Sequence, residues 1–85
     1  MERVVAREEV SEARLLAILN ERLAESPRCE DCNFPGPILR LEVPDERGCN
    51  WDDRPTLLRE GQSTYPCAAW ALRVVQEASK QYNLA

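Results

Sequence analysis

The chain has 85 residues, a formal net charge of −4 and no histidine. This length predicts a single small domain over residues 1–85 with a thin core, because such a domain buries only about 60–65% of the surface that its unfolded chain exposes. The acidic balance argues against a nucleic-acid partner, and the lack of histidine excludes the common hydrolytic triads and every imidazole metal ligand.

The N-terminal segment, Met1 to Glu9, becomes charged before an apolar signal segment could form, and charges interrupt every later hydrophobic run. We therefore expect a cytoplasmic protein with no membrane partner. In that reducing compartment cysteines stay as thiols, so an even number of them indicates metal binding or packing more than disulfides.

Residues 11–25 have the periodicity of an amphipathic helix, with leucines recurring every four residues on one face. Ser11 suits the N-cap, and the Ser26-Pro27 pair disfavours helical backbone, so the helix is expected to begin near Ser11 and end before Pro27. The preceding residues 4–6 favour a short strand, and a backward extension of the helix by two turns is the alternative.

Two prolines and a glycine interrupt residues 29–37, which are expected to form a tight loop. Residues 38–43 then alternate in the manner of a half-buried strand, with an inner face of Leu39, Leu41 and Val43. After a turn, residues 49–51 are expected to return as the second strand of a hairpin, and residues 56–60 to add a helical turn.

The last predicted element is a helix over residues 66–82, because Pro66 suits a first helical turn and the apolar residues that follow fall on one face. That face consists of Cys67, Ala71, Val74, Ala78 and Tyr82. The fold class is therefore α+β, with two helices packed on a small antiparallel sheet, the hairpin, and a cysteine-rich loop between them.

Four cysteines make the strongest candidate site. Cys29 and Cys32 form a CxxC pair, which brings two thiolates to the spacing of two tetrahedral vertices, and Cys67 lies at a helix N-terminus, where a thiolate is stabilised. Cys49, in the hairpin turn, completes the set, although it does not form a second CxxC pair with Cys67. We therefore predict a zinc site of Cys29, Cys32, Cys49 and Cys67.

Four other interpretations of the cysteines stay open: buried free thiols, structural disulfides, a redox CxxC and an iron–sulfur cluster, although the spacing matches neither common ferredoxin pattern. The acidic residues Glu30 and Asp31 between the two thiols, with no helix after them, argue against the redox interpretation. Trp51 lies in a polar segment, where it either anchors a partner or covers the hairpin.

These observations favour a non-catalytic, zinc-stabilised module that binds another protein or a second copy of itself, with no catalytic residue and no nucleotide cofactor predicted. A small thiol enzyme or sensor that uses Cys29 and Cys32 is the alternative from a different class. A third interpretation is an acidic inhibitor or nucleic-acid mimic that binds a basic partner.

Overall fold

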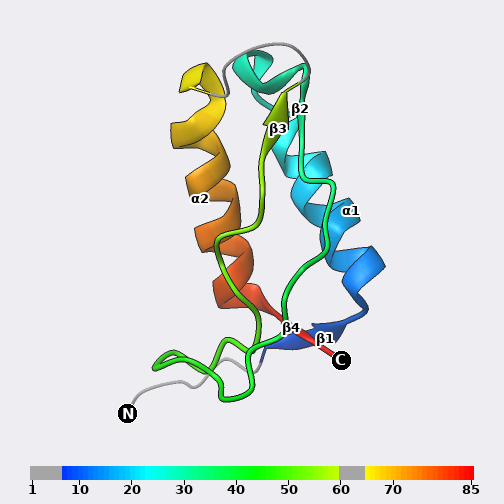
Figure 1. Ribbon diagram of the computed structural model, residues 1–85, viewed down its shortest axis with the longest axis vertical. Helices are drawn as coiled ribbons and strands as arrows, with labels where there is room; N and C mark the ends of the chain where they lie inside the picture. The colour runs from blue at the N-terminus through cyan, green and yellow to red at the C-terminus, as the bar shows by residue number, and fades with distance from the viewer. Residues whose placement is uncertain (1–6, 60–64) are drawn as a thin grey trace.

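The computed structural model describes residues 7–59 and 65–85. In Figure 1 the two helices lie side by side along the longest axis, and the segments that connect them run over one face of the pair. The elements in chain order are β1 (Glu8–Val10), α1 (Glu12–Leu23), the 3-10 helix η1 (Pro27–Cys29), β2 (Cys32–Asn33), β3 (Leu58–Arg59), α2 (Tyr65–Gln81) and β4 (Tyr82–Leu84). The predicted α+β class with two helices is confirmed, but the described strands form two separate two-stranded sheets.

Helix α1 begins and ends where its sequence signals place it. The Ser11 hydroxyl accepts a hydrogen bond from the Arg14 amide at 3.1 Å, and the helix ends at Leu23, before Pro27. The leucine face is buried, as predicted, together with Ile18. The strand predicted over residues 4–6 lies outside the described residues.

Helix α2 buries the predicted face, which consists of Cys67, Ala71, Val74 and Ala78, and also Val75 and Ser79. Tyr82 does not continue the helix and instead begins β4. Over the described residues, neither helix is long and apolar enough to span a membrane.

Strands β1 and β4 pair in parallel, from Glu8 beside Tyr82 to Val10 beside Leu84. This pairing brings the two ends of the described chain together, as Figure 1 shows at the end of the molecule opposite η1. The side chain of Asn50 extends the sheet, because its amide donates to the Leu84 carbonyl at 2.9 Å and accepts from the Leu84 amide at 2.7 Å. A hydrogen-bonded asparagine therefore takes the place of a third strand.

The predicted hairpin is present only as a single bridge between Arg40 and Trp51, and residues 38–43 do not form the predicted strand. The Leu41 amide donates to the Asn50 carbonyl at 2.9 Å, and the Asp52 amide donates to the Leu39 carbonyl at 2.8 Å. Leu39 is 60% exposed and Val43 is 77% exposed, so the prediction that they face the core is wrong.

The inner face of the hairpin contains Ile38, which is buried, and Trp51, which is fully buried. Arg40, which pairs with Trp51, is nevertheless exposed and Leu41 is half-buried, so burial does not alternate strictly along residues 38–43. A buried tryptophan contributes more apolar surface to the core than Leu39 or Val43 would, and both of those residues lie at the surface. The indole NH of Trp51 donates to the Tyr82 carbonyl at 3.0 Å, which ties the hairpin to β4.

The second sheet pairs β2 with β3 in antiparallel orientation, with Cys32 beside Arg59 and Asn33 beside Leu58. The helical turn predicted for residues 56–60 is therefore wrong at Leu58 and Arg59, and Glu60 lies outside the described residues. Strand pairing satisfies the backbone there without a local helical turn. The β2–β3 ladder places Cys32 next to the chain that leads toward α2.

Candidate functional site

A disulfide between Cys29 and Cys67 joins η1 to the first turn of α2. The two Cα atoms are 4.9 Å apart, although the cysteines are separated by 38 positions in the sequence. Cys29 is 1% exposed and Cys67 is fully buried, so the bond is shielded from solvent.

The local sequence explains how these two cysteines meet. Pro27 begins η1, and the Cys29 amide donates to the Ser26 carbonyl at 2.9 Å, which turns the chain sharply after α1. Pro66 lies in the first turn of α2, so Cys67 occupies the buried face at the start of that helix. The start of α2 at Pro66 was predicted from the sequence, whereas the 3-10 helix at Pro27 was not, and the proximity of the two cysteines depends on how these elements pack.

The other two cysteines are free thiols in different surroundings. Cys32 lies in β2, three residues after Cys29, and is partly exposed. Cys49 is fully buried near the opposite end of α2, where the amide of its neighbour Asn50 donates to the Asn83 side chain at 3.2 Å. Nearly the whole of α2 separates Cys67 from Asn83. At about 1.5 Å per residue, the part of the helix between them is roughly 20 Å long.

The structure therefore joins Cys29 to Cys67, and Cys32 follows Cys29 by three residues. Cys49 lies near the other end of α2. Within residues 7–59 and 65–85, no group of three or more cysteine or acidic side chains is arranged to hold a metal ion. The predicted four-cysteine zinc site is not shown. Zinc binding stays a prediction, and it would require reduction of the Cys29–Cys67 bond, because zinc binds thiolates.

The chain matches no family model, no curated protein and no solved structure. Function is therefore inferred from the chemistry of the described residues.

Cys49 has the properties of a packing residue. Burial raises the pKa of its thiol, and the negative charges of Asp45 and Asp53 raise it further. The neutral thiol donates to the Trp51 carbonyl at 3.4 Å. This environment suits the interpretation of Cys49 as a buried small apolar residue.

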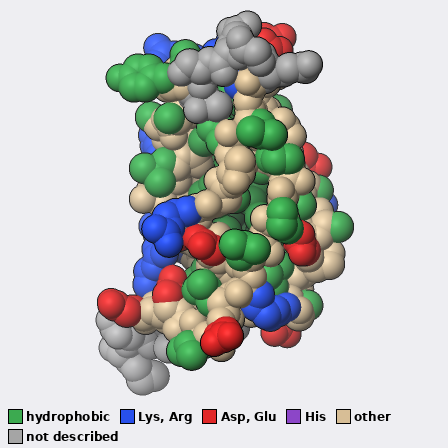
Figure 2. Space-filling model, viewed as in Figure 1, with side chains coloured by type: hydrophobic (Ala, Val, Ile, Leu, Met, Phe, Trp, Pro, Cys, Tyr) green, Lys and Arg blue, Asp and Glu red, His purple; other side chains and the backbone are tan. Residues whose placement is uncertain are grey.

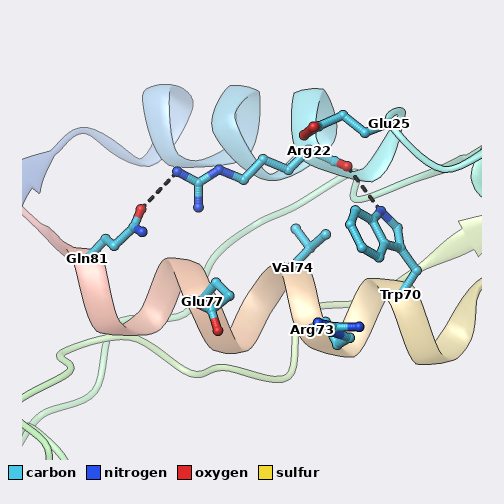
Figure 3. Close-up of a pocket in the computed structure, with 7 residues that line it drawn as sticks. All are labelled: Arg22, Glu25, Trp70, Arg73, Val74, Glu77 and Gln81. Carbon is cyan, nitrogen blue, oxygen red and sulfur yellow. Dashed lines mark hydrogen bonds between the residues drawn. The ribbon is translucent and has the colours of Figure 1, made fainter.

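A groove of about 270 Å³ lies between α1 and α2. In Figure 3 the side chain of Arg22 extends from α1 toward Gln81, and Trp70 points toward α1. The Trp70 indole NH donates to the Arg22 carbonyl at 3.1 Å, and the Arg22 guanidinium donates to the Gln81 amide oxygen at 2.8 Å. Arg22, Trp70 and Gln81 therefore already bind partners within the protein, while the charged residues Glu25, Arg73 and Glu77 also line the groove.

A second groove of the same volume, about 270 Å³, lies on the other side of α2 and is mostly apolar. We call it the α2 groove. Its lining residues are Phe34, Asp53, Pro55, Leu57, Ala68, Ala71, Leu72 and Val75. Hydrophobic side chains are spread over the middle of the face shown in Figure 2, where the segment leading to β3 crosses the helices. Leu72 is 56% exposed, and the Asp53 carboxylate accepts from the Arg47 guanidinium at 3.2 Å.

Sequence analysis did not single out Leu72. The available signal was a leucine off the buried face of an otherwise amphipathic helix, one position after Ala71. A single exposed leucine is common on protein surfaces, so this signal gains meaning only from the apolar groove beside it.

The Asp45 carboxylate organises the hairpin turn, and we expect its titration to be measurable. Burial raises its pKa, but hydrogen bonds from the Cys49 and Arg47 amides and the positive charge of Arg47 outweigh this effect, so the pKa lies below the usual value of an aspartate carboxyl. A lowered folded-state pKa contributes stability above the unfolded-state pKa, and this contribution is lost as pH falls through the folded-state pKa.

An NMR titration of the Asp45 carboxyl should therefore give a midpoint below that of an ordinary aspartate. Asp45→Asn should be less stable than the natural protein at neutral pH, and the difference should begin to shrink near the unfolded-state pKa of about 4 and vanish as the pH falls through the lower folded-state pKa. A midpoint at or above the ordinary aspartate value would contradict the assigned hydrogen bonds.

Proposed function

We propose that the protein is a non-catalytic interaction module that pairs with a second copy of itself through the α2 groove. The observation that carries this proposal is the position of Leu72, which stands more than half exposed at the edge of an apolar hollow on the same face. A projecting side chain and a hollow on one face can complement each other across a twofold axis, because the same surface then serves both subunits.

The chemistry of the groove suits a protein contact. Its lining is apolar apart from Asp53, and the cores of protein interfaces are depleted of charged residues. Arg47 already neutralises the Asp53 carboxylate, so two copies could meet there with little repulsion between like charges. The volume of about 270 Å³ leaves room for a large aliphatic side chain from the partner.

A disulfide and a strand pair hold the backbone around the α2 groove, which favours a preformed binding surface. The Cys29–Cys67 disulfide fixes the start of α2, and the β2–β3 ladder fixes the segment that follows Leu57. A preformed surface loses little conformational freedom on association. The zinc-stabilised form of this module, predicted from the four cysteines, would need the disulfide reduced and is a separate proposal.

Sedimentation velocity of the full chain, from about 10 µM to about 1 mM, should show a reversible monomer–dimer equilibrium by mass action. Leu72→Asp is expected to weaken the dimer at least about 10-fold, because it places an unpaired carboxylate in an apolar contact. Val43→Asp is the matched control, since Val43 is 77% exposed and does not line the groove.

A monomer over the whole concentration range would overturn the proposal. Equal effects of Leu72→Asp and Val43→Asp would also overturn it, because they would indicate a general effect of added negative charge. Circular dichroism of both variants should match the natural protein, since neither side chain is part of the core.

A further inference from the structure

We propose that Cys29, Cys32 and Cys67 form a thiol–disulfide exchange site, in which Cys32 is the entry point for a low-molecular-weight thiol or dithiol. This inference is independent of self-association through the α2 groove. It rests on the burial of the disulfide, the exposure of the third cysteine and the location of Cys67.

The first consideration is access. Cys29 and Cys67 are 1% and 0% exposed, so an external thiolate cannot approach either sulfur without local opening of the structure. Cys32 is partly exposed and lies three residues from Cys29, at the end of the turn that η1 begins. Thiol–disulfide exchange requires access to the sulfur that is attacked, so the exposed member of the CxxC pair is the natural route to the buried bond.

The second consideration is the chemistry of the steps. The Cys32 thiolate attacks the Cys29 sulfur, a Cys29–Cys32 bond forms, and the Cys29–Cys67 bond breaks with Cys67 leaving as a thiolate. This step is an isomerisation with no net oxidation, and the proton released by Cys32 is balanced by the proton that Cys67 takes up. An external thiolate then attacks the Cys32 sulfur, which breaks the Cys29–Cys32 bond, releases Cys29 as a thiolate and leaves a mixed disulfide on Cys32. A second thiol attacks the external sulfur of that mixed disulfide, releases Cys32 as a thiolate and forms the external disulfide, so that two electrons pass from the two thiols to the protein.

The third consideration is the leaving group. Cys67 lies in the first turn of the 17-residue helix α2, where the helix dipole offsets part of the cost that burial imposes on a thiolate. A stabilised leaving thiolate speeds exchange, so attack that releases Cys67 is the productive direction. The same step detaches the start of α2 from η1. The exchange is therefore a reversible release of the cross-link between η1 and α2.

The experiment measures reduction of the natural disulfide-bonded protein by dithiothreitol without denaturant, with aliquots quenched by an alkylating maleimide and free thiols counted by mass spectrometry. Cys32→Ser is expected to slow reduction at least about 10-fold, because the buried bond must then be attacked directly or after opening. Cys49→Ser is the matched control and should react at the natural rate, since Cys49 is a free thiol near the far end of α2.

A second readout separates exchange from unfolding. Low urea concentrations should leave the natural rate nearly unchanged, whereas reduction of Cys32→Ser should accelerate, because only the variant depends on opening. Cys32→Ala serves as a second substitution in case the serine perturbs β2. Equal reduction rates for the natural protein, Cys32→Ser and Cys49→Ser would overturn the proposal, as would a natural rate that rises with urea as steeply as that of the variants.

Discussion

Cys67→Ser is expected to lower the free energy of unfolding by about 4 kcal/mol, because loss of the disulfide frees a long loop in the unfolded chain. The bond closes a loop across 38 positions, and the entropy of closing a loop grows with its length. In a domain of this size, about 4 kcal/mol corresponds to a fall in melting temperature of roughly 15–30 °C. Urea unfolding followed by circular dichroism measures the change.

The matched comparison is the double variant Cys29→Ser/Cys67→Ser, which should be about as stable as either single variant. Once one sulfur is removed the cross-link is gone, so the second substitution adds only the cost of a buried hydroxyl. A loss below about 1 kcal/mol for the single variants would contradict the assigned role of the bond.

Trp51→Ala is expected to cost about 4 kcal/mol, because the side chain is fully buried and its removal leaves a cavity. It also leaves the Tyr82 carbonyl without the indole donor that binds it at 3.0 Å. The effect should appear in the free energy of unfolding and as faster amide exchange in β4, which the hairpin supports.

Two comparisons identify the source of that cost. Trp51→Phe keeps a buried ring but loses the indole NH, so it should cost about 1–3 kcal/mol. Trp70→Ala should cost less than Trp51→Ala, because Trp70 is only partly buried and borders the groove between α1 and α2. Equal losses for the two alanine variants would indicate that Trp51 does not hold the centre of the hairpin.

The two helices could be predicted because their signals are local. Ser11 caps α1, Pro27 lies beyond its end, and apolar residues at helical spacing mark both buried faces. The face of the hairpin could not be predicted, because residues 38–43 contain apolar residues of both parities. Trp51 and Ile38 are buried whereas Leu39 and Val43 are exposed, an outcome that depends on long-range packing and not on the local pattern.

The parallel β1–β4 pair was also beyond sequence reasoning. Each strand has three residues, and their pairing depends on contacts between the two ends of the described chain. The prediction for the cysteines was limited by a different cause. It relied on an expected reducing compartment to disfavour disulfides, and spacing along the chain does not report which sulfurs face one another across η1 and α2.

The disulfide and the β1–β4 pair lie near opposite ends of α2. Together they determine which segments of the chain would carry a pulling force and which would not. A mechanical load applied between residues 7 and 85 would first act along β1 and β4, whose parallel alignment puts their hydrogen bonds in shear. If that pair separated, tension would pass through α1, η1, the Cys29–Cys67 bond and α2. Residues 30–66, which carry the hairpin and one wall of the α2 groove, would lie outside the load path for as long as the sulfur bridge stayed intact.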